Sequence, residues 1–197
     1  LAIGINPSYD MNEIPRDDVS LLMELSRNSL VTDIFEPGST FKIITTAADL
    51  EEVRLGNAKA FDENHIFSNS DVRYVDGGMI KCWTKHTNGK HHNQNLQMAL
   101  NNSCNPVFTD VALALGFDTY YKYLEAFGIG EKTGIDFAGE QAGLVVSKDV
   151  VRLGDLARMG FGQSIAVTPI QLCAAVAAAV NGGVLYQPSL VKEIVDS

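Results

Sequence analysis

Apolar residues recur at helical spacing along most of the chain, and they alternate in only a few short stretches. The clearest case runs from Thr40 to about Val53, where the apolar positions predict a helix that begins near Ser39. Glycine and proline punctuate the rest of the pattern, so their positions predict where helices end. Further helices are expected within the ranges 8–28, 96–102, 107–115, 120–127, 149–163 and 168–183.

Strand signals are sparse. The run "LAIGI" at 1–5 has strand length and is ended by Asn6-Pro7, which predicts one strand followed by a turn. Two strand-like patches, Val72–Tyr74 and Met79–Trp83, interrupt an irregular polar segment at 61–93. With 197 residues and 46% apolar content, the chain is expected to form one mostly helical domain with a real core.

Composition narrows the class of partner. The net charge of −9 argues against nucleic acid, because a surface that follows phosphates needs a basic stripe. The longest purely apolar run, Leu172–Val180, is far shorter than the roughly 20 residues that cross a bilayer. Three cysteines without CxxC spacing are too few for a disulfide scaffold and leave the redox compartment open.

The stretch "EPGSTFK" places Ser39 three residues before Lys42 at the head of the predicted helix. Residues at this spacing share one helical face, so a neutral lysine can accept the hydroxyl proton while the serine attacks a carbonyl. The spacing also arises by chance, as at Ser189 and Lys192, and a serine here is more simply explained as a helix cap. Taken alone, the motif leaves both interpretations open.

Two further motifs have competing explanations. In "SCN", Ser103 offers a hydroxyl that can relay a proton, and Asn105 offers a carboxamide that can hold a substrate amide. The alternative for Ser103 is a turn residue before Pro106. The triplet Lys132-Thr133-Gly134 lies in a glycine-rich loop, whereas a triplet that pairs with an extended substrate belongs on an edge strand, so it is interpreted as structural.

In combination and in order, these stretches resemble the transpeptidase domain of class B penicillin-binding proteins, and within that family its sporulation-specific type. The resemblance covers nearly the whole chain, through "NPSYDMN", "EPGSTFK", "NLQMALNNSCNPVF", "GIGEKTGIDFAGE" and "GFGQSIAVTPIQLCAAVAAAVNGG". It implies the α/β (α+β) fold shared with serine β-lactamases. Residues 1–197 are then expected to be a partial, single transpeptidase domain, truncated at both ends, mostly helical and with little of the central antiparallel sheet.

The resemblance also implies roles. Ser39 is expected to be the acyl-forming nucleophile, Lys42 its general base, Ser103 a catalytic hydroxyl and Asn105 a substrate-binding residue. The implied reaction is D,D-transpeptidation of peptidoglycan stem peptides, with β-lactams as inhibitors and with no cofactor or metal. The alternatives are a D,D-carboxypeptidase or β-lactamase-like hydrolase, or a non-catalytic module that binds penicillin or a partner protein.

The family's catalytic Lys-Thr-Gly strand is expected beyond Ser197, so the isolated chain is predicted to be acylated poorly. A fluorescent penicillin that labels Ser39 rapidly and stoichiometrically in this chain alone would contradict that prediction. The family further implies action on the extracytoplasmic face of a bacterial membrane, an anchor in a segment outside this sequence, and a membrane glycan polymerase as partner.

The cysteines carry a separate hypothesis. Cys82 and Cys104 form a possible redox pair, because Cys104 lies inside the Ser103–Asn105 motif and disulfides persist outside the cytoplasm. Two thiols without a bond are the alternative. Cys82, His86, His91 and His92 gather in sequence like zinc ligands, but their spacing fits no standard finger, so no metal site is predicted.

Overall fold

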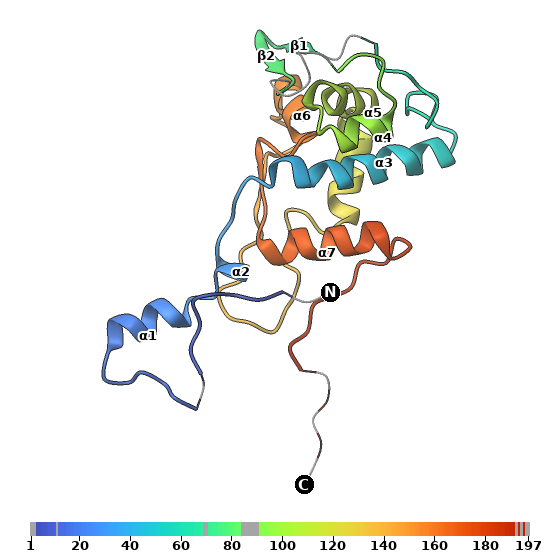
Figure 1. Ribbon diagram of the computed structural model, residues 1–197. Coiled ribbons are helices and arrows are strands. Elements are labelled where there is room, and N and C mark those ends of the chain that lie inside the picture. The colour runs from blue at the N-terminus through green and yellow to red at the C-terminus, as the bar shows by residue number, and fades with distance from the viewer. Residues whose placement is uncertain are drawn as a thin grey trace.

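The computed structural model describes residues 3–10, 12–68, 71–83, 91–191, 193 and 195. Helices make up most of the ordered elements, and the strands are short (Figure 1). In chain order the elements are α1 (Val19–Ser26), α2 (Ser29–Thr32), the 3₁₀ helix η1 (Gly38–Phe41), α3 (Lys42–Arg54), β1 (Val72–Val75), β2 (Gly78–Lys81), α4 (Leu96–Asn101), α5 (Asn105–Ala126), β3 (Leu144–Val145), α6 (Leu153–Met159), β4 (Ile165–Ala166) and α7 (Pro169–Val180).

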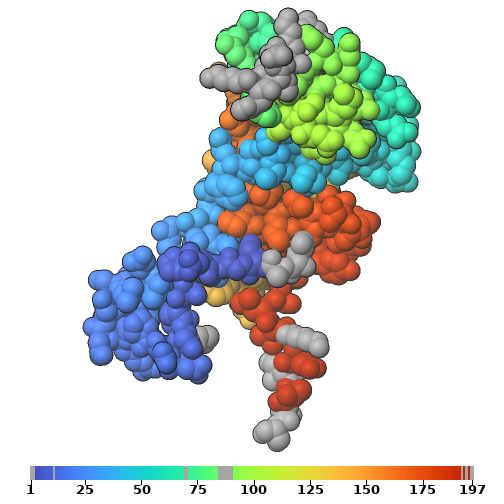
Figure 2. Space-filling model, viewed as in Figure 1, coloured from blue at the N-terminus to red at the C-terminus, as the bar shows by residue number. Residues whose placement is uncertain are grey.

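Helices α3 to α7 form a helical body in which α3 packs against both α5 and α7 (Figure 1). Helix α6 packs along α5, and the β1–β2 hairpin lies at the same end. The N-terminal arm that carries α1 lies to one side of this body (Figure 2), and α1 buries none of its residues. The core therefore sits between α3, α5 and α6, around the fully buried side chains of Phe41, Phe108, Val111, Leu156 and Met159.

The buried face of α3 carries polar side chains. Lys42, Thr45, Asp49 and Glu52 are all buried and follow one another at spacings of three, four and three residues, which keeps them on one face. Tyr120 and Tyr123 of α5 reach this face: the Tyr120 hydroxyl bonds Thr45 Oγ1 at 2.9 Å, and the Tyr123 hydroxyl donates to Glu52 Oε1 at 2.9 Å. Leu50, by contrast, is exposed.

The two strand-like patches predicted near Val72 and Met79 are confirmed as an antiparallel hairpin, in which Val75 pairs with Gly78. Asp76 and Gly77 form its two-residue turn with φ of 48° and 74°, the conformation that an Asp-Gly hairpin turn requires. Strands β3 and β4 pair to form a second small antiparallel sheet. The strand predicted at 1–5 is wrong for residues 3–5, which form no strand; Leu1 and Ala2 lie outside the described residues.

Glycine and proline act as the sequence predicts. Helix α5 is interrupted at Gly116, whose φ of 73° and ψ of 173° are not helical, so the predicted helices at 107–115 and 120–127 are confirmed as two pieces. Helix α7 begins with a capping box between Thr168 and Gln171 and has Pro169 in its first turn, which confirms the helix predicted within 168–183.

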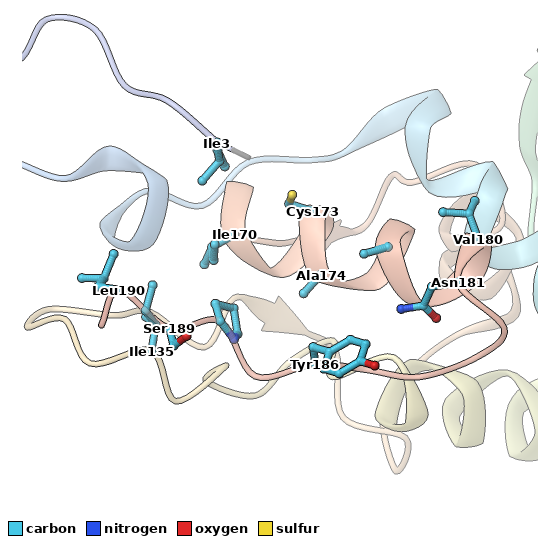
Figure 3. A pocket seen from close by; sticks show the side chains of 12 residues that line it. Ile3, Ile135, Ile170, Cys173, Ala174, Val180, Asn181, Tyr186, Ser189 and Leu190 are labelled. Atoms are coloured by element: carbon cyan, nitrogen blue, oxygen red, sulfur yellow. The ribbon is translucent and has the colours of Figure 1, made fainter. Parts of the chain in front are cut away.

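An apolar groove of about 500 Å³ lies between α7 and the segment that follows it (Figure 3). Ile170, Cys173 and Val180 of α7 line one wall, and Tyr186 and Leu190 of the later segment line the other. Val180, Tyr186 and Leu190 are strongly exposed. Among the described residues, every helix is too short or too polar to cross a membrane.

Candidate active site

Ser39 lies on the 3₁₀ turn η1, which continues directly into α3. Phe41 anchors this turn in the core, while Ser39 itself is exposed. Neither η1 nor α3 has a side-chain hydrogen bond at its N-cap, so Ser39 does not cap a helix. Its hydroxyl instead lies 2.9 Å from Lys42 Nζ and 2.8 Å from Ser103 Oγ. Of the two interpretations that the motif left open, the structure excludes the cap.

A distant glycine holds this turn. Gly38 N donates to Gly162 O at 2.9 Å, and Gly162 has a φ of 77°. A Cβ atom on Gly162 would lie 2.1 Å from Gly38 O, so only glycine allows the two backbones to approach this closely. The sequence interpretation gave Gly162 no role of its own. Its signal was present in the stretch "GFGQ", which contains two glycines around Phe161.

Ser103 lies just after the C-terminal end of α4, where the chain changes direction before α5. Ser103 N donates to Leu100 O at 3.0 Å and Cys104 N donates to Ala99 O at 2.9 Å, the pair of bonds that defines a Schellman ending. This ending needs a left-handed residue, and Ser103 has a φ of 51°. Helix α5 then begins at Asn105. At this junction between α4 and α5, the carbonyl and the hydroxyl of Ser103 both face the side-chain amine of Lys42.

The predicted site residues meet at the amine of Lys42. Lys42 Nζ lies 2.9 Å from Ser103 O, 2.8 Å from Ser103 Oγ and 2.7 Å from Asn105 Oδ1, in addition to Ser39 Oγ. Residues from η1, α3 and the α4–α5 junction thus converge on one amine. The sequence interpretation gave Asn105 a role in holding substrate; the structure adds a contact with the lysine.

Burial sets the chemistry of Lys42. Its side chain is fully buried, and loss of hydration lowers the pKa of its ammonium group to about 8. A neutral lysine has two N–H groups and one lone pair. Ser103 O and Asn105 Oδ1 accept hydrogen bonds and cannot donate, so they take the two N–H groups and turn the lone pair toward the hydroxyls. In this neutral state Ser39 donates to Lys42 and accepts from Ser103, whereas the protonated ammonium of Lys42 donates to Ser39.

The triplet Lys132-Thr133-Gly134 lies in the loop that the sequence predicts, away from any strand. The buried carboxylate of Glu140 organises this loop, because it accepts from Thr133 N, Thr133 Oγ1 and Gly134 N. Lys132 is exposed. The contacts of the triplet are therefore structural ones, within its own loop and with Gln187, whose side-chain Nε2 donates to Gly134 O.

We expect Glu140→Ala to lower the free energy of unfolding by about 2–3 kcal/mol, because three donors lose a charged acceptor. Lys132→Ala is the matched control, with an expected change within about 0.5 kcal/mol and unchanged labelling of Ser39 by a fluorescent penicillin. Urea denaturation of the full-length variants measures both free energies. A Lys132→Ala protein that folds normally but is no longer labelled would contradict the structural assignment of the loop.

Cys82, His91 and Cys104 lie behind the Ser103–Asn105 junction, with their ligand atoms all within 4.8 Å of one another. Neither cysteine is in a disulfide in this structure, and the redox pairing of Cys82 with Cys104 stays a prediction. Burial raises the pKa of the Cys82 thiol to about 12, and the neighbouring Cys104 adds to the shift. Of the other histidines once grouped with them, His92 is exposed and His86 lies outside the described residues.

Trp83 borders the same junction. Its indole Nε1 donates to Asn102 O at 2.9 Å, and its ring lies 6.3 Å from that of His91, in a T-shaped arrangement. About half of the side chain is exposed. These contacts give Trp83 a packing role at the junction.

The fold and the four converging residues define a class of protein. The solved transpeptidase domain of penicillin-binding protein 3 from Burkholderia pseudomallei superimposes with a TM-score of 0.75 at 23% identity, covering 85% of this chain and 48% of that one. A peptidoglycan glycosyltransferase from Burkholderia ambifaria gives a TM-score of 0.76 at 22% identity, covering 87% and 51%. At this identity the likeness shows the fold: that of penicillin-binding-protein transpeptidase domains.

The family follows from sequence comparison. The family model of the penicillin binding protein transpeptidase domain matches residues 1–197, and the chain belongs to this family. Stage V sporulation protein D of Bacillus subtilis is 41% identical over 198 residues, which cover 100% of this chain and 29% of that protein. Peptidoglycan D,D-transpeptidase FtsI of Escherichia coli K12 is 30% identical, over 98% of this chain and 30% of that protein. The chain thus spans less than a third of either relative.

Proposed function

We propose that this chain is part of a serine D,D-transpeptidase that cross-links peptidoglycan stem peptides through an acyl-enzyme on Ser39. The observation that carries the proposal is the contact between the buried Lys42 amine and Ser39 Oγ at 2.9 Å, completed by Ser103 and Asn105. The names of the relatives, which include peptidoglycan D,D-transpeptidases, support the same reaction.

In the proposed acylation, Ser39 Oγ attacks the carbonyl carbon of the penultimate D-Ala of a stem peptide. Its proton passes to Lys42 Nζ, directly or through Ser103 Oγ, which lies 2.8 Å from both atoms. The bond to the terminal D-Ala breaks, and the departing amine takes up that proton. An amine of a neighbouring stem peptide then attacks the ester, and Ser39 regains its proton.

Asn105 is proposed to contact the substrate as well as the base. Its Oδ1 atom binds Lys42 Nζ at 2.7 Å, which fixes the plane of the carboxamide beside the nucleophile. A carboxamide held in this way presents its other polar atom in a defined direction to an amide of a bound peptide. The side chain thereby couples the position of the base to the position of the substrate.

The proposal is tested with the full-length protein, pentapeptide-containing peptidoglycan and a fluorescent penicillin. Mass spectrometry of the digested product separates the outcomes. Cross-linked dimers supported by Ser39 establish transpeptidation, and release of D-Ala into water without dimers establishes a carboxypeptidase instead. Penicillin labelling with neither product would favour the non-catalytic binding module and would contradict the proposal.

The pH dependence of acylation follows from the lowered pKa of Lys42. The base works only as the neutral amine, so below pH 8 the rate should fall with the neutral fraction, to about a tenth of its plateau at pH 7, and above pH 8 it should level off. Stopped-flow labelling by a fluorescent penicillin from pH 6 to 9.5 measures the profile. Thermal unfolding at each pH is the control for loss of structure, and a flat profile in a folded protein would remove Lys42 as the base.

The wider setting is also part of the proposal. Action on peptidoglycan requires an extracytoplasmic location at a bacterial membrane, with a glycan polymerase as the source of the strands. The 41% identity to a stage V sporulation protein supports a role in sporulation. Fractionation of cells that express the full-length protein from its own promoter tests the location and timing together.

A further inference from the structure

Three side chains from separate segments meet directly behind the proposed catalytic junction. Cys82 follows β2, His91 lies on the segment that leads to α4, and Cys104 stands between Ser103 and Asn105. Their ligand atoms all lie within 4.8 Å of one another, and Cys82 Sγ is 3.1 Å from His91 Nδ1. His91 is buried, Cys104 is fully buried and Cys82 is half-buried.

The backbone holds each of these residues in place. Cys82 N donates to Asp71 O at 2.9 Å, which fixes the end of β2. Gln94 pairs with Phe67 through the backbone, and its side-chain Nε2 donates to His91 O at 3.3 Å. Cys104 is locked by its bond to Ala99 O at the end of α4. The donor atoms therefore converge before any ligand is bound.

We propose that Cys82, His91 and Cys104 form a zinc-binding site that fixes the Ser103–Asn105 junction. Two thiolates and one imidazole are the donor set that zinc prefers in proteins. Tetrahedral zinc at ordinary bond lengths separates such donors by roughly 3.5–3.8 Å. The observed separations, from 3.1 Å to at most 4.8 Å, bracket that value, so binding requires shifts of about 1 Å or less.

The fourth ligand comes from outside the three-residue cluster, because no further His, Cys, Asp or Glu ligand atom among the described residues lies within 4.8 Å of all three. The carboxylate Oδ1 atom of Asp71 is buried without a hydrogen-bond partner among the described residues. The backbone bond between Asp71 and Cys82 places this residue at the edge of the cluster. A buried carboxylate oxygen without a donor is stabilised by a cation, so Asp71 or a water molecule completes the tetrahedron.

The charge balance suits the neighbouring site. Zinc carries two positive charges and binding releases two thiol protons, so zinc with two thiolates, neutral His91 and a water ligand is neutral overall, and with Asp71 as fourth ligand it carries one negative charge. With water as the fourth ligand, the metal site restrains the junction without adding net charge beside Lys42. A disulfide between Cys82 and Cys104 would use the same two sulfur atoms, so the zinc site and the bond exclude each other.

The test uses the full-length protein purified under reducing conditions with added zinc. Elemental mass spectrometry after removal of loose metal should find one zinc ion per chain in the wild type, and replacement by Co²⁺ should give the thiolate-to-cobalt absorption of a tetrahedral site. Cys82→Ser and His91→Ala should both lose the metal and the absorption. Asp71→Asn should weaken zinc binding about 10- to 100-fold if the carboxylate is the fourth ligand, and wild-type affinity assigns that position to water.

Two matched variants serve as controls. Cys173→Ser removes a thiol outside the cluster, and His92→Ala removes the exposed neighbour of His91, so both should retain one zinc ion. Circular dichroism confirms that every variant is folded. Zinc-free wild-type protein with no cobalt spectrum would overturn the proposal. So would protein from oxidising conditions that shows a Cys82–Cys104 bond by mass spectrometry and takes up no zinc after reduction.

Discussion

Replacing Ser39 by alanine is expected to lower the rate of acylation by a fluorescent penicillin by on the order of 10⁴- to 10⁶-fold, because no other group takes over a missing nucleophile. The fold should persist, since Ser39 is exposed and Lys42 keeps its bonds to Ser103 and Asn105. We expect the free energy of unfolding to change by less than about 0.5 kcal/mol. Gel labelling of the full-length protein, with mass spectrometry of the acylated peptide, measures the effect.

Ser189→Ala is the matched control for this variant. Ser189 precedes Lys192 at the same spacing and is exposed, although Lys192 lies outside the described residues. Its variant should be acylated at the wild-type rate. Normal labelling of Ser39→Ala, or an acylated peptide that maps to Ser189, would overturn the assignment of the nucleophile and with it the proposed function.

Replacing Lys42 by methionine is expected to slow acylation by about 10²- to 10⁴-fold, the usual range for loss of a general base. Methionine matches the lysine in length but leaves Ser103 O and Asn105 Oδ1 without their donor inside the protein. We therefore also expect the free energy of unfolding to fall by about 1–3 kcal/mol. Labelling kinetics well below the unfolding midpoint, together with urea denaturation, separate the two effects.

Lys59→Met is the control, because this exposed lysine can be replaced with an expected change within about 0.5 kcal/mol and no effect on acylation. A second variant distinguishes the base from a structural tether. Lys42→Ala leaves space for a small amine, so added ethylamine should partly restore acylation if Lys42 removes the proton. A folded Lys42→Ala protein that acylates at the wild-type rate without added amine would contradict the proposed role.

Local chemistry explains why the helical elements could be predicted. Gly116 interrupts α5 and Pro169 opens α7 because their backbones restrict the residues around them, whatever the rest of the chain does. The Asp76-Gly77 turn defines the hairpin in the same way. A short apolar run such as 1–5 is compatible with several structures, so its predicted strand was wrong for residues 3–5.

Helix α3 shows the limit of the apolar pattern. The pattern assigns charged residues to solvent, yet Asp49 and Glu52 are buried on the face that carries Lys42. Their partners come from distant segments: Phe61 N donates to Asp49 Oδ1 at 3.1 Å, and Tyr123 donates to Glu52. Burial of a polar group depends on such partners, and no window along α3 contains them.

The sequence by itself determined which side chains are available and the one contact that helical spacing guarantees, between Ser39 and Lys42. It also identified Ser103 and Asn105 through the ordered resemblance of its motifs. Only the tertiary structure decided that Ser39 is not a cap, that Ser103 reaches it across 64 residues, and that Lys42 is buried. The physical reason is that the pKa and hydrogen bonds of a lysine depend on what surrounds it, and here the surroundings are assembled from η1, α3 and the α4–α5 junction.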